Sequence, residues 1–423
     1  MNRTFRGCLL FGLLSISLSS AIEAADGSWS RFRGPNGTGI SEATTIPVRW
    51  TADDYRWRVE LPGIGYSSPV ICGERVFVTS ASEDDATQVI HCLRTGDGSP
   101  IWKREYASTT HPKHKLNCYA SSTPALDAER LYFVWATPEE YHVAALDQVS
   151  GAEIWRREVG PFVAEHGYGA SPIVFEDLVI LSNDQDGESS TFALDAKTGE
   201  TRWQTPRKTE KTAYATPLIY QSEGGPPQLI QSSWAHGVSS LDPRTGAVNW
   251  EIDVITYRVV GSPAVASGLI VAGCGGGGVG RRMVAVRPGD PANSTKPELV
   301  YEMKGALPYV PTPIAKDPLV FLWGDQGVVT CLNAPTGEVL WKERVGGNFF
   351  GSPVRVGGHL YCISREGELV VLAASEKYEL VSRMDLGERS NSTPAIADGV
   401  MYLRTVSHLM AIGGARRPTI AKD

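Results

Sequence analysis

The chain has 423 residues, a formal net charge of -7 and a hydrophobic fraction of 42%. A negative balance without a sizeable basic cluster excludes the usual nucleic-acid-binding proteins, which need a basic face. Length alone suggests two or three domains, but a regular internal repeat overrides that expectation and indicates one large repeat domain.

The first 24 residues are typical of a secretory signal peptide. Arg3 and Arg6 precede an apolar run over residues 8–18, and the small residues Ala21 and Ala24 follow it. The run is too short for a permanent membrane span, and Cys8 stands at its start instead of following it, which does not fit a lipoprotein cleavage site. We therefore expect an exported monomer without a transmembrane segment, located in the periplasm or outside the cell.

Residues 25–54 are expected to form an irregular N-terminal arm. Their centre, WSRFRGPNGTG over residues 29–39, is rich in turn formers and arginine. No strand precedes its glycines and no helix follows them, so a phosphate-binding loop is not supported. We expect this arm to pack across the ring that the repeats form.

Eight Ser-Pro or Thr-Pro dipeptides open apolar runs at intervals of 40 to 55 residues. The prolines are Pro69, Pro124, Pro172, Pro217, Pro263, Pro313, Pro353 and Pro394. Proline cannot donate to a strand ladder and is confined to an edge strand or a strand start, as at the innermost strand of a propeller blade. The intervals fit four strands per blade. They predict an all-β fold over residues 55–412, an eight-bladed β-propeller of four-stranded antiparallel blades.

A second pattern, Ala-x-Asp-x-x-Thr-Gly-x-x-x-Trp, marks the hairpin between the third and fourth strands of a blade. Asp195, Gly199 and Trp203 form one copy. The Asp bonds the backbone of its own turn, and the Gly supplies the positive φ that a tight hairpin needs. Each Trp is then expected to dock against a neighbouring blade; the tryptophans concerned are Trp57, Trp102, Trp155, Trp203, Trp250 and Trp341.

The two ends of the chain predict how the ring closes. The repeat that starts at Pro394 has no outer strand of its own, and residues 413–423 read as a disordered tail. Residues 55–61 resemble an outer strand, so we expect them to complete the eighth blade. Closure would remove an open sheet edge that invites aggregation.

One face of the propeller collects residues that break the repeat, because two classes of loop open onto it. His166, Asp325 and Arg365 belong to this face. The candidate ligand-binding residues are Tyr66, His114, Asn117, Tyr119, Tyr168, Asp184, Tyr214, Arg258, Tyr309 and Arg404. The tyrosines could form a stacking platform for a flat or sugar-like ligand; the alternative is that they fill the channel and pack blades together.

No catalytic or metal-ligating set is predicted. His111 and His114 share a loop, but spacing assures no third ligand. Residues 183–187 hint at a calcium loop and lack the later bidentate Glu, so a polar hairpin is favoured. Cys92 and Cys331 replace small residues of the repeat and read as buried thiols, and no nucleophile elbow is present.

At its Asp-x-x-Thr-Gly-x-x-x-Trp copies, the chain resembles the pyrroloquinoline-quinone-like (PQQ-like) repeat propellers. The family includes eight-bladed quinoprotein dehydrogenases, BamB-type scaffolds of outer-membrane protein assembly, and many exported propellers of unknown role. For the dehydrogenases the resemblance implies an adjacent Cys pair, a Trp floor, a calcium held by Glu, Asn and Asp, and an Asp base. This chain has no adjacent Cys pair and matches no calcium set.

The sequence therefore favours an exported, non-catalytic scaffold without a cofactor, which binds a protein partner or a small ligand in the cell envelope. The alternative is a PQQ-dependent oxidoreductase that uses the quinone with calcium.

Overall fold

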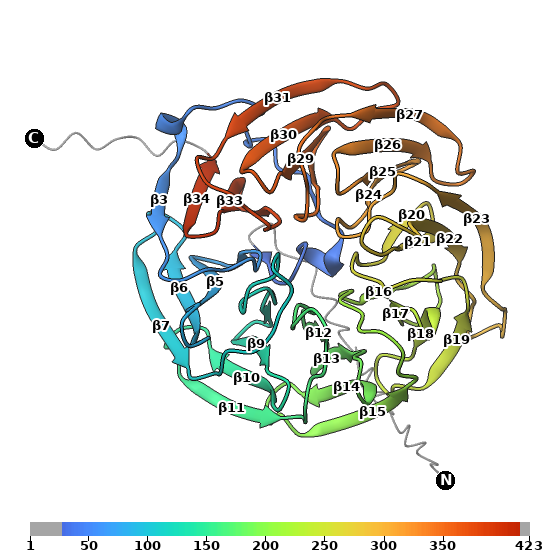
Figure 1. The fold of residues 1–423 in the computed structure, drawn as a ribbon, viewed down its shortest axis with the longest axis horizontal. Helices are drawn as coiled ribbons and strands as arrows, with labels where there is room; N and C mark the ends of the chain where they lie inside the picture. The colour runs from blue at the N-terminus through green and yellow to red at the C-terminus, as the bar shows by residue number, and fades with distance from the viewer. Residues whose placement is uncertain (1–27, 415–423) are drawn as a thin grey trace, which may run out of the picture.

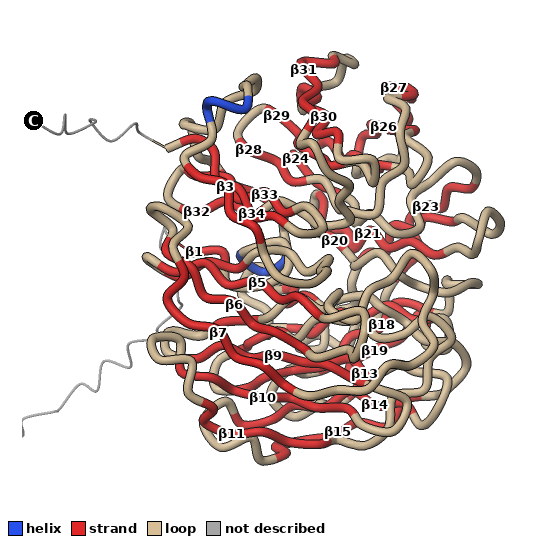
Figure 2. Tube along the Cα trace, turned by 60° about the vertical axis from the view of Figure 1, so that its left-hand side comes forward, coloured by secondary structure: helices blue, strands red, loops and turns tan. Residues whose placement is uncertain are grey.

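The computed structural model describes residues 28–414 as eight antiparallel sheets arranged around a central axis (Figure 1). This arrangement confirms the predicted eight-bladed, all-β propeller. Nearly all regular structure is strand (Figure 2), and the helical elements of the described residues are two 3-10 turns, η1 (Pro35–Gly37) and η2 (Ala52–Asp54). The predicted signal peptide, and the part of the predicted tail from residue 415 onward, lie outside the described residues. Between residues 28 and 414, no helix is long and apolar enough to cross a membrane.

Each blade is a meander of four strands that runs from the axis to the outer wall. Blades 1 to 4 comprise β4 (Val70–Cys72), β5 (Arg75–Ala81), β6 (Gln88–Arg94) and β7 (Pro100–Tyr106); β8 (Ala125–Leu126), β9 (Arg130–Ala136), β10 (Tyr141–Asp147) and β11 (Glu153–Glu158); β12 (Ile173–Phe175), β13 (Leu178–Asn183), β14 (Ser189–Asp195) and β15 (Thr201–Arg207); and β16 (Leu218–Tyr220), β17 (Gln228–Ser233), β18 (Gly237–Leu241) and β19 (Val248–Ile252).

Blades 5 to 8 continue around the ring. They comprise β20 (Ala264–Ala266), β21 (Leu269–Cys274), β22 (Arg282–Arg287) and β23 (Glu298–Lys304); β24 (Ile314–Lys316), β25 (Leu319–Trp323), β26 (Val328–Asn333) and β27 (Val339–Arg344); β28 (Val354–Val356), β29 (His359–Ile363), β30 (Glu368–Ala373) and β31 (Leu380–Asp385); and β32 (Ala395–Ala397), β33 (Val400–Arg404), β34 (His408–Gly413) and β3 (Trp57–Glu60).

Every innermost strand begins at the residue that follows a repeat proline, as β4 does after Pro69 and β32 after Pro394. The proline therefore stands just outside the ladder, where its missing N–H leaves no strand partner unsatisfied. The ring closes as predicted, because β3 adds to β34 as the outer strand of blade 8, with Trp57 opposite Ala411 and Glu60 opposite His408. The paired segment is shorter than the predicted 55–61.

The repeat tryptophans of the outer strands join neighbouring blades. Trp203 of blade 3 donates its indole N–H to the Pro243 carbonyl of blade 4 at 3.1 Å and is 8% exposed. A Cβ placed on Gly246 would lie 2.4 Å from the Trp203 ring, so the glycine makes room for it. The same donation to the next blade recurs at Trp57, Trp102, Trp155, Trp250 and Trp341, and Tyr301 makes it for blade 5.

The N-terminal arm crosses the ring axis, where Figure 1 shows it in dark blue. Its β1 (Ser28–Trp29) pairs with β4 of blade 1, and its β2 (Ile40–Ser41) lies parallel to β28 of blade 7. Between them, Arg31 donates to the Pro217 carbonyl at 2.5 Å and Asn36 exchanges hydrogen bonds with Ile219, both in blade 4. The arm thus ties together blades from opposite sides of the ring.

Candidate functional site

A cavity of about 530 Å³ lies on the propeller axis, and we call it the channel-mouth pocket. Its walls come from every blade, and Phe32 of the arm also lines it. Strands β1 and β2 of the arm pair with the last residues of the innermost strands β4 and β28. The pocket, in contrast, is lined by the residues that precede the innermost strands. The pocket is therefore open toward one face of the propeller and backed by the arm on the other side.

A belt of hydroxyl groups encircles the pocket, one from each blade. Its members are the residues before the repeat prolines: Ser68, Thr123, Ser171, Thr216, Ser262, Thr312, Ser352 and Thr393. Within the described chain, six of these hydroxyl oxygens make the same contact. Each accepts a hydrogen bond of 2.9 to 3.1 Å from the backbone N–H of the belt residue in the preceding blade. The Ser or Thr of the repeat thus joins adjacent blades at the axis.

Six of the predicted ligand-binding residues line the pocket: Tyr66, His114, Asn117, Tyr214, Arg258 and Tyr309. Burial raises the pKa of Tyr66, Tyr214 and Tyr309, so their hydroxyls stay protonated at neutral pH. The pocket wall is therefore partly aromatic and carries neutral hydroxyl groups at neutral pH.

Asn117 and His114 hold two loops together beside the pocket: the loop from blade 1 to blade 2 and the loop from blade 2 to blade 3. The Asn117 side-chain amide donates to the carbonyls of His166 and Tyr168 at 2.9 and 3.1 Å. The His114 ring lies 5.0 Å from the His166 ring, and burial lowers the pKa of His114. His111 instead contacts the Tyr119 ring. Among residues 28–414, no three His, Cys, Asp or Glu side chains gather in a way that could hold a metal ion.

The cationic side chains of the pocket differ in how well they are compensated. Arg258 donates to Glu165 at 2.7 Å and to the His166 ring at 2.7 Å. Arg281 lies 3.6 Å from Asp325. The Asp325 carboxylate accepts the backbone N–H groups of Tyr309 and Val310, although burial raises its pKa. Arg281 and Arg258 therefore each face an acidic group.

Arg365 is the exception among these arginines. Its guanidinium lies 4.7 Å over the Phe350 ring, a cation–π contact. Within the part of the chain that the structure describes, its side chain makes no hydrogen bond or ion pair. The next residue, Glu366, accepts the backbone and side-chain N–H groups of Asn348 instead. The pocket thus carries one half-buried positive charge without a partner.

Four of the predicted ligand-binding residues do not line the pocket. Tyr168 is buried among core side chains and shares a hydrogen bond of 2.9 Å with the Tyr141 hydroxyl. The Tyr119 hydroxyl bonds the backbone of His111. Arg404 is fully buried and donates to the Ser67 hydroxyl at 2.8 Å. These three side chains pack the loops, which is the alternative that the sequence left open for the tyrosines.

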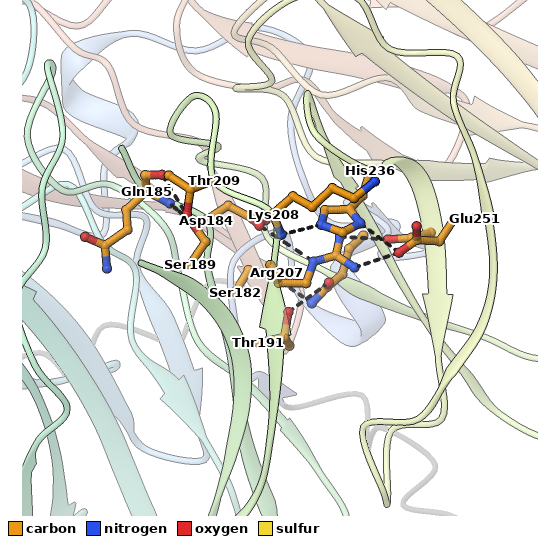
Figure 3. A network of polar contacts seen from close by, with 12 residues as sticks. Ser182, Asp184, Gln185, Ser189, Thr191, Arg207, Lys208, Thr209, His236 and Glu251 are labelled. Carbon is orange, nitrogen blue, oxygen red and sulfur yellow. Dashed lines mark hydrogen bonds and ion pairs between the residues drawn. The ribbon is translucent and has the colours of Figure 1, made fainter. Parts of the chain in front are cut away.

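Asp184, the fourth, belongs to an ionic network between blades 3 and 4 (Figure 3), in which Asp184, Arg207 and His236 are buried. Arg207 lies 3.7 Å from the Asp184 carboxylate and 3.3 Å from Glu251. The His236 Nε2 accepts the Lys208 N–H at 2.7 Å, so its Nδ1–H donates to Glu251 at 2.8 Å. Burial lowers the pKa of His236 and keeps it neutral. The network joins two blades and does not reach the pocket.

Several pocket residues were not singled out from the sequence. The sequence places His166, Asp325 and Arg365, as well as Arg281 within the run over residues 274–282, on the right face only, and it does not single out Phe32 or the hydroxyl belt. The belt had a visible signal, because a Ser or Thr precedes every repeat proline. From the sequence alone, this dipeptide predicts only a strand start, because of its proline.

One Ser–His–Glu grouping occurs near the end of the chain, but its geometry does not suit nucleophilic catalysis. The Ser407 hydroxyl and the Glu388 carboxylate both contact Nδ1 of His408, each at 3.1 Å. A triad needs the nucleophile and the orienting acid on different ring nitrogens. The grouping instead stabilises the Glu388 charge and lowers the pKa of Glu388 to about 2, against the opposing effect of burial.

Comparison with known proteins gives relatives of two kinds. The outer membrane protein assembly factor BamB of Yersinia pestis is 23% identical over 285 residues, which cover 64% of this chain and 68% of that protein. The crystal structure of BamB from Moraxella catarrhalis has a TM-score of 0.58 at 16% identity and covers 88% of this chain and 99% of its own. A quinohemoprotein alcohol dehydrogenase from Comamonas testosteroni has a TM-score of 0.66 at 14% identity, with coverages of 92% and 81%. At these identities the structural likenesses establish the fold alone.

A family model described as outer membrane protein assembly factor BamB matches residues 86–288 and 302–414, which is well over half of the chain. The match spans most blades of the propeller and confirms the resemblance drawn from the tryptophan motif. The chain therefore belongs to the BamB family of PQQ-like repeat propellers.

Proposed function

We propose that this protein is an exported, non-catalytic propeller that acts as a binding scaffold in the cell envelope and holds a partner protein over the channel-mouth pocket. The supporting observation is the pocket itself, which is open on one face, backed by the arm, and walled by aromatic and arginine side chains. Clefts of this size with a few convergent polar groups are where proteins usually bind their ligands. No cofactor is required in this proposal.

The family supports a place in the cell envelope. Its matched relatives are named for the assembly of outer membrane proteins, and the first 24 residues read as a secretory signal. Fractionation of cells that express the full chain, followed by N-terminal sequencing, should find a periplasmic or secreted protein that starts near Ala25. Recovery of the uncleaved chain from the cytoplasm would contradict export.

Partner binding is tested by affinity purification of the tagged protein from chemically cross-linked cell envelopes. Tyr257→Asp changes the face around the pocket, and Val248→Asp is the matched control on the outer wall, where Val248 is 49% exposed. The proposal predicts a defined partner that wild type and Val248→Asp retain and Tyr257→Asp loses. Equal recovery with all three proteins, or no partner with any, would contradict it.

The second candidate is a PQQ-dependent oxidoreductase, favoured by the arginines and aromatic rings on the axis. The residues fit the quinone only in part. Of the described residues, no tryptophan lines the pocket, and no acidic group there joins others to form a calcium site. Calorimetric titration with pyrroloquinoline quinone and calcium, followed by a dye-linked alcohol oxidation assay, separates the candidates. One-to-one binding with turnover would replace the scaffold proposal, and absence of both supports it.

A further inference from the structure

The hydroxyl belt presents donors that nothing in the protein uses. Six of its oxygens accept a backbone N–H, yet within residues 28–414 none of the eight hydroxyls donates a hydrogen bond to a protein group. All eight line the pocket. Their O–H groups therefore remain available to an occupant that offers acceptor oxygens.

The charge of the pocket also favours an occupant with acceptor oxygens. Glu165 compensates Arg258, and Asp325 faces Arg281, but Arg365 has no acidic partner among the described residues. Hydrogen bonds between a guanidinium and a carboxylate are about twice as strong as neutral ones. A free guanidinium on the axis of a chain whose formal net charge is -7 therefore favours a carboxylate over a neutral group.

Apolar side chains continue from the pocket onto its rim. We call Trp234, Tyr257 and Val279 the rim patch; Trp234 and Tyr257 have ring centroids 6.1 Å apart, and Val279 is 64% exposed. A Cβ on Gly276, which lines the pocket, would lie 3.7 Å from Val279 and 4.0 Å from Tyr257. A Cβ on Gly275 would lie 3.2 Å from Tyr309 of the pocket wall. The glycine-rich loop thus joins pocket and rim patch into one surface.

From this juxtaposition, and resting on the proposed function, we infer that the partner inserts an extended acidic segment into the channel mouth. A carboxylate of the segment binds Arg365 and the hydroxyl belt, and an adjacent apolar side chain lies on the rim patch. A small carboxylate held on the axis would leave Val279 and Tyr257 in water, whereas a peptide covers them and gains the free energy of burying their apolar surface. The rim patch therefore favours a peptide as the occupant.

The test uses fluorescence anisotropy with labelled, end-blocked octapeptides in which two aspartates alternate with phenylalanines. Each peptide is paired with a copy that carries asparagine instead, and sodium phenylacetate is the free carboxylate probe, measured by calorimetry. The proteins are the wild-type mature chain, Arg365→Gln, Arg365→Lys, Val279→Asp and the outer-wall control Val248→Asp. Thermal melting verifies that each variant is folded.

The inference predicts that the acidic peptide binds at least tenfold more tightly than its amide copy, with an affinity that falls as salt rises. Arg365→Gln should weaken the acidic peptide at least tenfold, Arg365→Lys less, and Val248→Asp not at all. Val279→Asp should weaken the peptide and leave phenylacetate unchanged.

Equal binding of the two peptides, no binding of either, or full affinity in Arg365→Gln would overturn the inference. Tight phenylacetate binding together with an unchanged peptide affinity in Val279→Asp would overturn it too, because the site would then serve a small carboxylate. If Arg365→Gln still captures the envelope partner as wild type does, this inference fails while the scaffold function stands. Loss of any partner from the wild-type protein removes the scaffold function instead.

Discussion

Replacement of Arg33 by methionine tests how the arm is held in the ring. Arg33 is fully buried, and burial lowers its pKa to about 9, which leaves it charged at neutral pH. Its guanidinium donates to the carbonyls of blades 6 and 7, at 3.3 Å to Thr312, 3.0 Å to Pro353 and 2.9 Å to Pro313. It also bonds the arm's own carbonyls at Gly37 and Thr38. In Arg33→Met, all five acceptors lose this partner.

The expected loss follows from these bonds. Hydrogen bonds to a charged group contribute about 1.5 to 3 kcal/mol each, but water can reach carbonyls that a detached arm exposes. We therefore expect a loss of about 3 to 5 kcal/mol, limited by the free energy with which the arm docks. Unfolding entropy of about 2.1 cal/mol/K per residue converts this into a fall in Tm of roughly 4 to 6 °C if the propeller unfolds as one unit.

Differential scanning fluorimetry measures the change, and limited proteolysis reports whether the arm has become accessible. The matched control is Arg49→Met, because Arg49 is an exposed arm residue that donates to a single carbonyl, that of Val381. The control should change Tm by less than about 1 °C, as a surface substitution does. An Arg33→Met protein with the Tm and the proteolysis pattern of wild type would refute the role assigned to the arm.

Three further predictions test the ring. Trp203→Ala should cost about 3 to 5 kcal/mol by removing a buried indole and its hydrogen bond to Pro243. Urea unfolding measures this loss, with Val248→Ala as the control, and equal midpoints for the two variants would rule out docking by the tryptophan. Thr312→Val should cost about 1 to 3 kcal/mol, because the Ser262 N–H loses its acceptor, and a melting curve like that of wild type would remove the belt's stabilising role. Burial lowers the pKa of His91 to about 4, so the unfolded chain takes up a proton on this imidazole at a higher pH than the folded chain does. The free energy of unfolding therefore falls as the pH drops from about 6.5 toward 4. His91→Gln should lose up to about 3 kcal/mol of that pH dependence, and a slope like that of wild type between pH 7 and 4.5 would contradict the assignment.

The fold could be read from the sequence because its signals repeat and are local. Each proline marks a strand start by its missing N–H, and each Asp–Gly–Trp copy defines one hairpin and its contact with the next blade. Ring closure follows from a missing outer strand at one end and a spare strand, predicted over residues 55–61 and paired over residues 57–60, at the other. None of these inferences requires distances between separate blades.

The site was harder to predict because its residues converge from separate blades, and the direction of each side chain is decided by packing. Arg404 turns inward since Gly65 leaves room for it; a Cβ there would lie 1.9 Å from the guanidinium. Asp184 turns toward Arg207 of its own blade, while Arg365, in an equivalent class of loop, has no such partner and stays in the pocket. Loop position alone does not distinguish these outcomes.

Site-specific photo-crosslinking in living cells tests the scaffold account most directly. A photoreactive amino acid replaces Gln326, an exposed residue of the pocket lining, or Val339, 45% exposed on the outer wall. The account predicts a discrete crosslinked envelope protein from position 326 and none from position 339. Crosslinks from position 339 alone, or none from position 326, would contradict it.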